Sequence, residues 1–350
     1  MLLSRFSETI IRGTSAAVPR TRLWLLTVAL AVSGCTGPFP QSTLHPRSDF
    51  ARATDVLFTQ IFWWAAAVFV VVELLLVVAL ARFRHREGRP APKPTHGHTL
   101  MEIAWTLAPA VILVFVAVPT VRTIFATAGE APPPDALKVE VIGHQWWWEY
   151  RYPDLGIVSA NELHVPVGKP VQVAITSADV IHSFWAPRLG GKRDAIPGRV
   201  NHIAFRADSV GDYSGQCAEF CGASHANMRL DVRVESDSGF QAWVAGQRAG
   251  PATPPAASLA EQGRAVYARS ACIGCHAIQG VSPGVIGPNL THVGSRSTIA
   301  GGIFPNDSAH LAPWIADAPA LKPGSIMTRM KPPLSDADIA ALVAYLQSLK

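Results

Sequence analysis

Two long apolar stretches lie near the start of the chain. Ile61–Ala81 has 21 residues and contains a single ionisable side chain, Glu73, while Ile103–Val121 has 19 residues. A helix rises about 1.5 Å per residue, so roughly 20 apolar residues cross the hydrocarbon core of a bilayer. The pattern therefore predicts two membrane-spanning helices joined as a hairpin.

The loop between these stretches is basic and rich in proline. Its basic residues are Arg82, Arg84, Arg86, Arg89 and Lys93. Such loops stay in the cytoplasm, so the chain after about residue 125 is expected in the periplasm or outside the cell. Six basic against two acidic residues give residues 82–125 a charge of +4, and eleven against fourteen give residues 126–250 a charge of −3. A nucleic-acid-binding protein would concentrate basic residues on a folded domain, so that class is excluded.

An export signal is predicted for residues 1–34. Arg20 and Arg22 precede the apolar run Leu23–Val32, which is too short to span a membrane. The following Val32-Ser33-Gly34-Cys35 resembles the lipobox of bacterial lipoproteins. We expect lipidation of Cys35, the alternative being an uncleaved signal anchor in which this cysteine is incidental.

From Leu137 onward the pattern changes to short segments in which β-branched and aromatic residues alternate with polar ones. The segments are Lys138–Ile142, Gln145–Tyr152, Pro170–Thr176, Arg199–Phe205 and Met228–Glu235. Alternation with a period of two predicts strands, and their spacing predicts an antiparallel sandwich or barrel.

A stretch rich in proline and alanine, residues 249–257, separates this region from residues 258–350, which are predicted to form helices and loops. In the last helix Ser335 is the expected cap and Ile339, Leu342 and Leu346 share one apolar face. The predicted order is a signal (1–34), an N-terminal segment with the hairpin (35–125), a β domain (126–248), a linker (249–257) and a helical domain (258–350).

The five cysteines suggest two sites. Cys217 and Cys221 form a C-x3-C pair, and Cys272 and Cys275 form C-x2-C followed by His276. In an exported protein, disulfides are the default interpretation of paired cysteines. That interpretation is disfavoured here because each pair has histidine and methionine companions.

The first pair belongs to a soft ligand set. Cys217 and Cys221 lie near His225 and Met228 in sequence, and His182 lies on an earlier segment. Thiolates, imidazoles and a thioether suit copper better than magnesium or calcium. Because a blue-copper site needs only one cysteine, the second favours a binuclear centre. Structural zinc is the alternative for two cysteines and two histidines, but methionine is an unusual zinc ligand.

The string from Gly215 to Met228 resembles the CuA motif of cytochrome c oxidase subunit II, and the similarity extends over about Pro40–Val234. The resemblance implies a cupredoxin-like fold. It also implies that Cys217 and Cys221 bridge two coppers and that His182 and His225 bind one copper each. The same resemblance makes Met228 a weak ligand and Glu219 a ligand through its backbone carbonyl. In the family the same glutamate side chain reaches a magnesium or manganese ion at the boundary with subunit I.

Two further residues are identified by this resemblance alone. The aromatic stretch Gly143–Tyr150 matches the family, in which the first tryptophan, here Trp146, receives electrons at the surface. Glu102 matches a glutamate near the mouth of a proton channel in subunit I. Without the resemblance, all three tryptophans of the stretch would be assigned to packing.

The second pair has the C-x2-C-H pattern of covalent haem attachment, in which two thiols add to the haem vinyl groups and the histidine binds iron. Gly287-Pro288-Asn289-Leu290 is typical of cytochrome c, so an all-α class I cytochrome c domain is expected. Met327 and Met330 are the candidates for the sixth iron ligand. Because Lys322–Met327 resembles the family's K-P-G-x-x-M segment, Met327 is favoured, and a His/Met pair gives a relatively high potential.

The resemblance implies subunit II of a bacterial inner-membrane oxidase with a fused cytochrome c domain. The expected partners are subunits I and III, a donor cytochrome c and the membrane. Electrons would pass from haem c and CuA to subunit I, coupled to proton translocation. The alternatives are nitrous oxide reductase, which needs a further copper-cluster domain, and a redox carrier without an oxidase partner. The related quinol oxidases lack the copper ligands, which argues against them.

Overall fold

A computed structural model describes residues 39–84, 87–88, 94, 96–128, 133–327 and 334–350. The predicted signal, Cys35 and Met330 lie outside these residues. Gln41–Lys350 form one compact unit.

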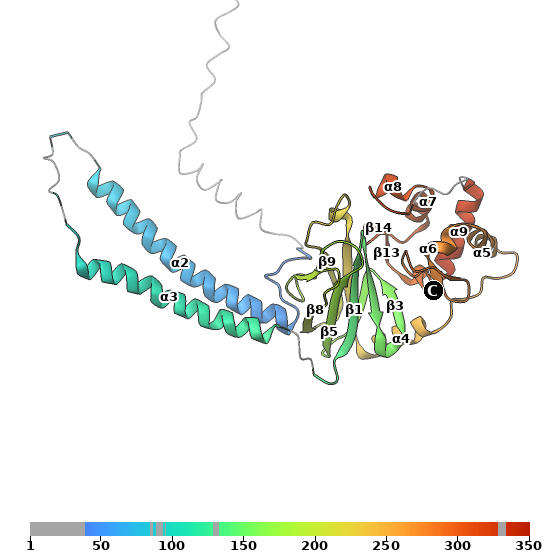
Figure 1. Cartoon of the computed structure of the whole chain (residues 1–350), viewed down its shortest axis with the longest axis horizontal. Coiled ribbons are helices and arrows are strands. Elements are labelled where there is room, and N and C mark those ends of the chain that lie inside the picture. Colours follow the sequence, from blue (N-terminus) through green and yellow to red (C-terminus); the bar gives the residue numbers. More distant parts are fainter. Residues whose placement is uncertain (1–38, 85–86, 89–93, 95, 129–132, 328–333) are drawn as a thin grey trace, which may run out of the picture. The chain divides into compact units, whose positions relative to one another are not determined.

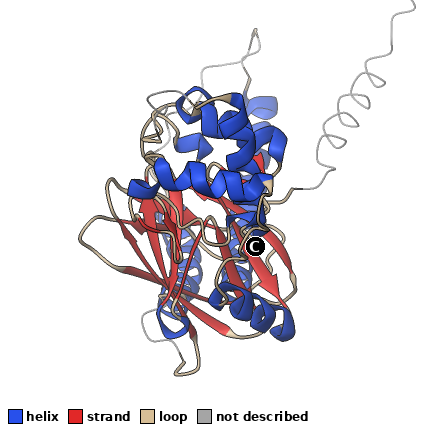
Figure 2. Ribbon diagram, turned by 90° about the vertical axis from the view of Figure 1, so that its right-hand side faces the viewer, coloured by secondary structure: helices blue, strands red, loops and turns tan. Residues whose placement is uncertain are grey.

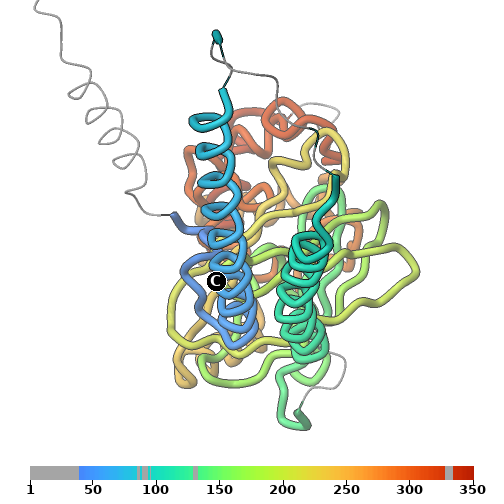
Figure 3. The backbone as a smooth tube through the Cα atoms, turned by 90° about the vertical axis from the view of Figure 1, so that its left-hand side faces the viewer, coloured from blue at the N-terminus to red at the C-terminus, as the bar shows by residue number. Residues whose placement is uncertain are grey.

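Two long helices begin this unit, α2 (Asp49–Phe83) and α3 (Thr99–Ala126). Both are long and apolar enough to cross a membrane. They lie side by side (Figure 3), with the Trp64 and Phe115 rings stacked 5.7 Å apart. Each helix extends beyond its predicted apolar stretch. The Ser48 hydroxyl caps α2, and the Asp49 carboxylate accepts a hydrogen bond of 2.7 Å from the backbone of Arg206, which joins the helix to a strand.

Ten strands follow in two five-stranded sheets, which form the β-sandwich domain (Figure 2). In the first sheet the order is β3 (Ile157–Ala160), β2 (Trp147–Tyr152), β1 (Leu137–His144), β5 (Pro170–Ser177) and β8 (Asn201–Arg206). In the second it is β4 (Glu162–Pro166), β10 (Arg229–Glu235), β9 (Gly211–Cys217), β6 (His182–Trp185) and β7 (Arg193–Ala195). A 3-10 turn, η1 (Pro153–Leu155), joins β2 to β3.

The sandwich is confirmed, but its sheets are mixed. β1 pairs with β5 in parallel, and β10 pairs with β4 in parallel, so the predicted antiparallel pairing does not hold for these two pairs. The strands alternate as their sequences predict. Val171, Val173 and Ile175 of β5 are fully buried, while the residues between them are partly exposed. Helix α4 (Asp237–Arg248) packs Phe240 and Trp243 on the edge of this core.

Residues 258–350 form the helical domain. Its helices are α5 (Leu259–Arg269), α6 (Cys272–Cys275), α7 (Ser308–Ala316), α8 (Ala318–Leu321) and α9 (Asp336–Ser348). Ser335 caps α9 by accepting from the backbone of Asp338, as predicted. Gly263 lets α5 approach α9, because a Cβ there would meet the carbonyl oxygen of Ala341.

Short strands and turns complete this domain. They are β11 (Ala277–Ile278), β12 (Ser282–Pro283), β13 (Thr298–Ile299), β14 (Phe304–Pro305) and the 3-10 turn η3 (Val293–Ser295). The two small hairpins were not predicted. In Figure 1 the helical domain is the orange and red part of the chain.

Candidate copper and haem sites

Strand pairing brings the predicted copper ligands together. β6 begins at His182 and pairs with β9, which ends at Cys217, with Phe184 opposite Cys217. The loop after β9 carries Cys221 and the short 3-10 turn η2 (His225–Asn227), and it ends at Met228 just before β10. Two segments about 35 residues apart therefore supply one cluster.

The cluster has the dimensions of a metal site. The Sγ atoms of Cys217 and Cys221 lie 3.8 Å apart, so they form no disulfide. Cys217 Sγ is 3.8 Å from His182 Nδ1, and Cys221 Sγ is 3.5 Å from His225 Nδ1 and 3.9 Å from Met228 Sδ. His182, Cys217 and Cys221 are buried and offer ligand atoms all within 4.8 Å of one another. Two sulfurs flanked by two ring nitrogens and a thioether fit a soft metal pair.

The electrostatics favour a negative charge on the sulfur pair. The hydrogen bond between the two thiols lowers the pKa of Cys217 to about 3 even though the site is buried. The same hydrogen bond, together with burial, raises the pKa of Cys221. Burial opposes protonation of His182, but its hydrogen bonds to Cys217 and Asp179 raise its pKa. One sulfur therefore gives up its proton readily, which prepares the pair for a cation.

Asp179 fixes the orientation of His182. Its carboxylate accepts from His182 Nε2 at 2.9 Å and from the backbone N–H of Gln145 at 2.7 Å. With Nε2 held by the carboxylate, Nδ1 faces the Cys217 sulfur. Burial raises the pKa of Asp179, but these hydrogen bonds lower it below its usual range. Asp179 was not predicted as a site residue, although its place three positions before a ligand histidine was the available signal.

We expect Asp179→Asn to weaken copper binding by roughly 10- to 100-fold, the usual cost of removing a carboxylate that orients a metal-bound histidine. The measurement is a competition titration of copper against a chelator. Asp194→Asn, at an exposed position of β7 in the same sheet, is the matched control. Equal copper affinity in the two variants would rule out this role for Asp179.

Glu219 lies between the two cysteines. Its backbone carbonyl oxygen is 3.2 Å from Cys217 Sγ, close enough to join the ligand set. Its carboxylate accepts from the backbone N–H of Phe220 at 3.2 Å, and Phe220 is 76% exposed. The Glu219 side chain therefore lies at the surface of the loop and away from the sulfur pair.

A second site is an apolar cavity of about 230 Å³ lined by Cys272, Cys275, His276 and Met327. His276 Nδ1 is 2.8 Å from the carbonyl oxygen of Pro288, which leaves Nε2 available. Burial lowers the pKa of His276, which keeps the ring neutral as a metal ligand requires. A Cβ on Gly287 would lie 2.5 Å from this ring, so only glycine permits the contact.

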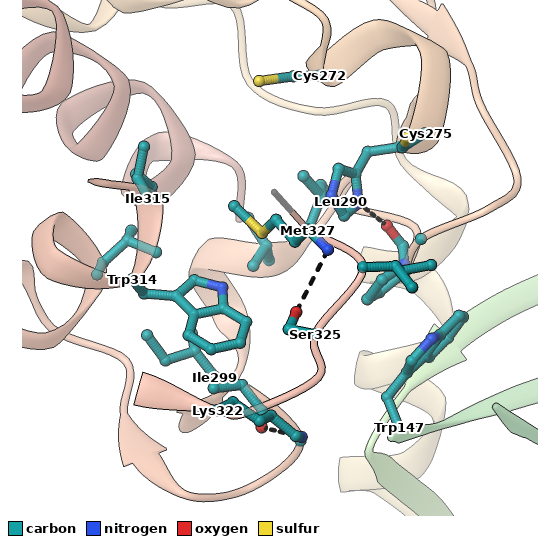
Figure 4. A pocket seen from close by; sticks show the side chains of 18 of the residues that line it. Trp147, Cys272, Cys275, Leu290, Ile299, Trp314, Ile315, Lys322, Ser325 and Met327 are labelled. Atoms are coloured by element: carbon teal, nitrogen blue, oxygen red, sulfur yellow. Dashed lines mark hydrogen bonds between the residues drawn. The ribbon is translucent and has the colours of Figure 1, made fainter. Parts of the chain in front are cut away.

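The cavity fits a flat apolar cofactor attached at one edge. Leu290, Ile299, Trp314 and Ile315 form its walls, and Figure 4 shows Met327 pointing into it. The backbone N–H of Met327 donates to Ser325 Oγ at 3.3 Å, which holds the loop. Met327 is the described candidate for the sixth ligand.

Trp146 contacts both sites. Its ring N–H donates to the carbonyl oxygen of Cys221 at 2.9 Å, and Gln145 Nε2 donates to the same oxygen at 2.8 Å. Trp146 and Trp147 also line the cavity that contains His276. The family resemblance placed Trp146 at a surface, yet here it is only 7% exposed because the helical domain covers it.

Glu102 is not part of either site. It lies in the first turn of α3, and the β-sandwich domain follows the other end of this helix. Ala126 lies 24 positions after Glu102, which corresponds to about 36 Å of helix. The structure therefore places Glu102 at the far end of α3 from the β-sandwich domain and its sulfur cluster.

A thiol–imidazole cluster on a β-sandwich, a C-x2-C-H cavity in a helical domain and two apolar helices define a membrane protein for metal-centred electron transfer. Three family models match the chain. They describe the transmembrane domain of cytochrome c oxidase subunit II over residues 45–123, its periplasmic domain over residues 156–235 and cytochrome c over residues 260–350.

Whole-chain relatives agree with these models. Cytochrome c oxidase subunit 2 of Alkalihalophilus pseudofirmus is 38% identical, over 92% of this chain and 95% of its own length. The protein of the same name from Bacillus subtilis is 34% identical, over 95% of this chain and 98% of its own length. The crystal structure of the periplasmic domain of subunit II of cytochrome oxidase from Bradyrhizobium japonicum is 39% identical. The match covers 33% of this chain and 96% of the Bradyrhizobium chain, with a TM-score of 0.32.

The chain belongs to the cytochrome c oxidase subunit II family, in the form that carries a C-terminal cytochrome c domain. It is a subunit of a haem–copper oxidase, which implies subunit I as a partner. The predicted family and multidomain fold are confirmed.

Proposed function

We propose that this subunit receives electrons from a donor cytochrome c at its helical domain and passes them through its β-sandwich domain to subunit I. When bound, haem c and the CuA copper pair supply the one-electron centres of this route, which ends in oxygen reduction coupled to proton translocation. The observation that carries the proposal is the position of Trp146, which lines the His276 cavity and donates to the carbonyl of a cluster cysteine.

In the copper site, Cys217 and Cys221 would bridge the two metals, with His182 and His225 as one nitrogen ligand each. Met228 and the backbone carbonyl of Glu219 would be the weak outer ligands. A buried, rigid ligand set changes little in geometry between oxidation states, which favours fast transfer. The Glu219 carboxylate, at the loop surface beside Phe220, is proposed to bind magnesium or manganese together with subunit I.

In the helical domain, Cys272 and Cys275 would hold the haem covalently, with His276 and Met327 as the axial ligands. The Pro288 carbonyl orients His276, and burial keeps the ring neutral. The cavity walls are mostly apolar, which favours a high potential.

The proposed setting is a bacterial inner membrane, with α2 and α3 crossing it and residues 126–248 and 258–350 on the periplasmic side. Residues 249–257 would link the two domains, and subunit III would complete the complex. The β-sandwich domain is net acidic and suits a basic donor cytochrome, but docking there is secondary to electron entry through the helical domain.

The test is oxygen uptake by the purified complex. We expect co-purification with a polypeptide that carries haem and oxygen uptake driven by reduced cytochrome c. Subunits of quinol oxidases are also similar to this chain, one of them 33% identical over 65% of it. Uptake driven by quinol alone, with no response to reduced cytochrome c, would refute the proposal.

Glu102 is proposed to line the mouth of a proton channel in subunit I. We expect Glu102→Gln to lower turnover severalfold without changing copper or haem content, because the amide cannot carry a proton. The measurement is steady-state oxygen uptake, with Glu87→Gln in the loop before α3 as the control. Turnover equal to that of the unaltered complex would remove Glu102 from the proton route.

Cys35 is proposed to become the lipidated N-terminus after removal of residues 1–34. We expect the intact mass of the purified subunit to match a chain that begins at Cys35 and carries lipid. A mass that retains Met1 would contradict the proposal.

A further inference from the structure

A buried lysine joins the helical domain to the β-sandwich domain. Lys322 follows α8, is only 3% exposed and donates at 2.6 Å to two carbonyl oxygens. One carbonyl belongs to Ala300 of its own domain and the other to Trp146 of the β-sandwich domain. Burial lowers the pKa of Lys322 to about 7. Burying a charged ammonium group here would cost free energy if the two carbonyl acceptors were absent.

A buried glutamate makes the second connection. Glu162 of β4 is 2% exposed, and one of its oxygens accepts from Ser297 N at 2.7 Å, Ser297 Oγ at 2.6 Å and Thr298 N at 3.2 Å. Its other oxygen lies 3.3 Å from Arg233 Nε, which compensates its charge. A carboxylate with three donors from the other domain loses all of them if the domains separate.

Two further hydrogen bonds cross between the domains. Arg229 N donates to the Gly301 carbonyl at 2.9 Å, and Ser224 Oγ donates to the Pro323 carbonyl at 2.6 Å. Gly301 and Gly324 have φ of +79° and +82°. A Cβ on Gly324 would lie 2.5 Å from a ring carbon of Trp146, and one on Gly301 would lie 2.8 Å from its carbonyl oxygen. The backbone of the helical domain is therefore shaped to lie against Trp146.

The linker alone does not impose this arrangement. Residues 249–257 comprise nine residues, which reach about 30 Å when extended. A domain held only by this linker would undock freely, so the docked state depends on the contacts themselves.

We propose that Lys322 and Glu162 form an interdomain clamp that keeps the helical domain docked, with the open side of its cavity against Trp146. Both are positioning residues. The proposal rests on the proposed function, since it assigns the clamp the task of keeping the internal donor in place throughout turnover.

The test is retention of the helical domain after the linker is cut. A protease site is placed within residues 249–257 of the full chain in detergent, the chain is immobilised through its N-terminal part, and the linker is cleaved. We expect the helical domain to stay bound, and the double variant Lys322→Met, Glu162→Gln to release it at least tenfold faster. Removing buried hydrogen bonds to charged groups weakens an association by about tenfold or more, which sets the expected change in release rate.

The matched control is Arg269→Met with Asp338→Asn, an exposed ion pair within the helical domain. The helical domain of this control variant should stay bound as it does in the unaltered chain. Prompt release of the helical domain from the unaltered chain would overturn the clamp. Equal retention of the helical domain in the clamp variant and the control variant would also overturn it. Copper and haem contents are measured first. A chain that lacks either cofactor refutes the proposed function, while retention of the helical domain after cleavage still tests the clamp.

A second readout separates positioning from mere structural support. Internal electron transfer from the reduced helical domain to the β-sandwich domain is followed optically in buffers of increasing viscosity. A clamped domain gives a rate independent of viscosity, and the clamp variant should slow in proportion to viscosity. A viscosity-dependent rate in the unaltered chain would contradict the clamp.

Discussion

Replacing either Cys217 or Cys221 with serine is expected to eliminate the paired copper site and to lower oxygen uptake by at least about 100-fold. The two sulfurs lie 3.8 Å apart between the nitrogens of His182 and His225, so each sulfur would bind both metals. A serine hydroxyl is harder and keeps its proton, so it does not replace a bridging thiolate. The measurements are copper per chain and oxygen uptake with reduced cytochrome c.

Histidine variants provide the matched comparison. His225→Ala should lower copper content, whereas His202→Ala, on β8 outside the cluster, should leave it at two per chain. Two coppers and normal uptake in either cysteine variant would contradict a bridged pair.

The double variant Cys272→Ala, Cys275→Ala is expected to abolish covalent haem while copper stays at two per chain. The two sites lie in separate domains with separate hydrophobic cores, so loss of one ligand set does not remove the other. Haem is measured by its absorption after denaturation, when only covalently attached haem remains with the protein. Covalent haem in the double variant would contradict the assignment.

Met327→Ala is the companion variant. It should retain covalent haem but lose the methionine-to-iron absorption band, because the side chain that points into the cavity is removed. Persistence of this band would transfer the assignment to Met330.

The helices and the soft ligand set were predictable because their signals are local. Apolar length defined α2 and α3, and the ligands Cys217, Cys221, His225 and Met228 fall within twelve residues. The strands were predicted only in part. β3, β4, β6, β7 and β9 were missed, since they are short or carry polar residues that only pairing across the sheet explains. Parallel pairing of β1 with β5 is a long-range contact that alternation does not encode.

The residues between the domains were beyond sequence reasoning. Lys322 and Glu162 are charged side chains that ordinarily lie at a surface, and they are buried only because one domain covers the other. The burial of Trp146 has the same cause. Lys322 stands in the K-P-G segment that identified Met327, so its position was noticed but its contact was not predictable.

The most direct test of the two redox sites is metal and haem analysis of the purified full-length subunit, with optical spectra. We expect two coppers and one covalently attached haem per chain, with spectra of a mixed thiolate–imidazole copper pair and a His/Met haem. Zinc in place of copper, a single copper per chain, or no haem after expression with a haem-attachment system would contradict this expectation.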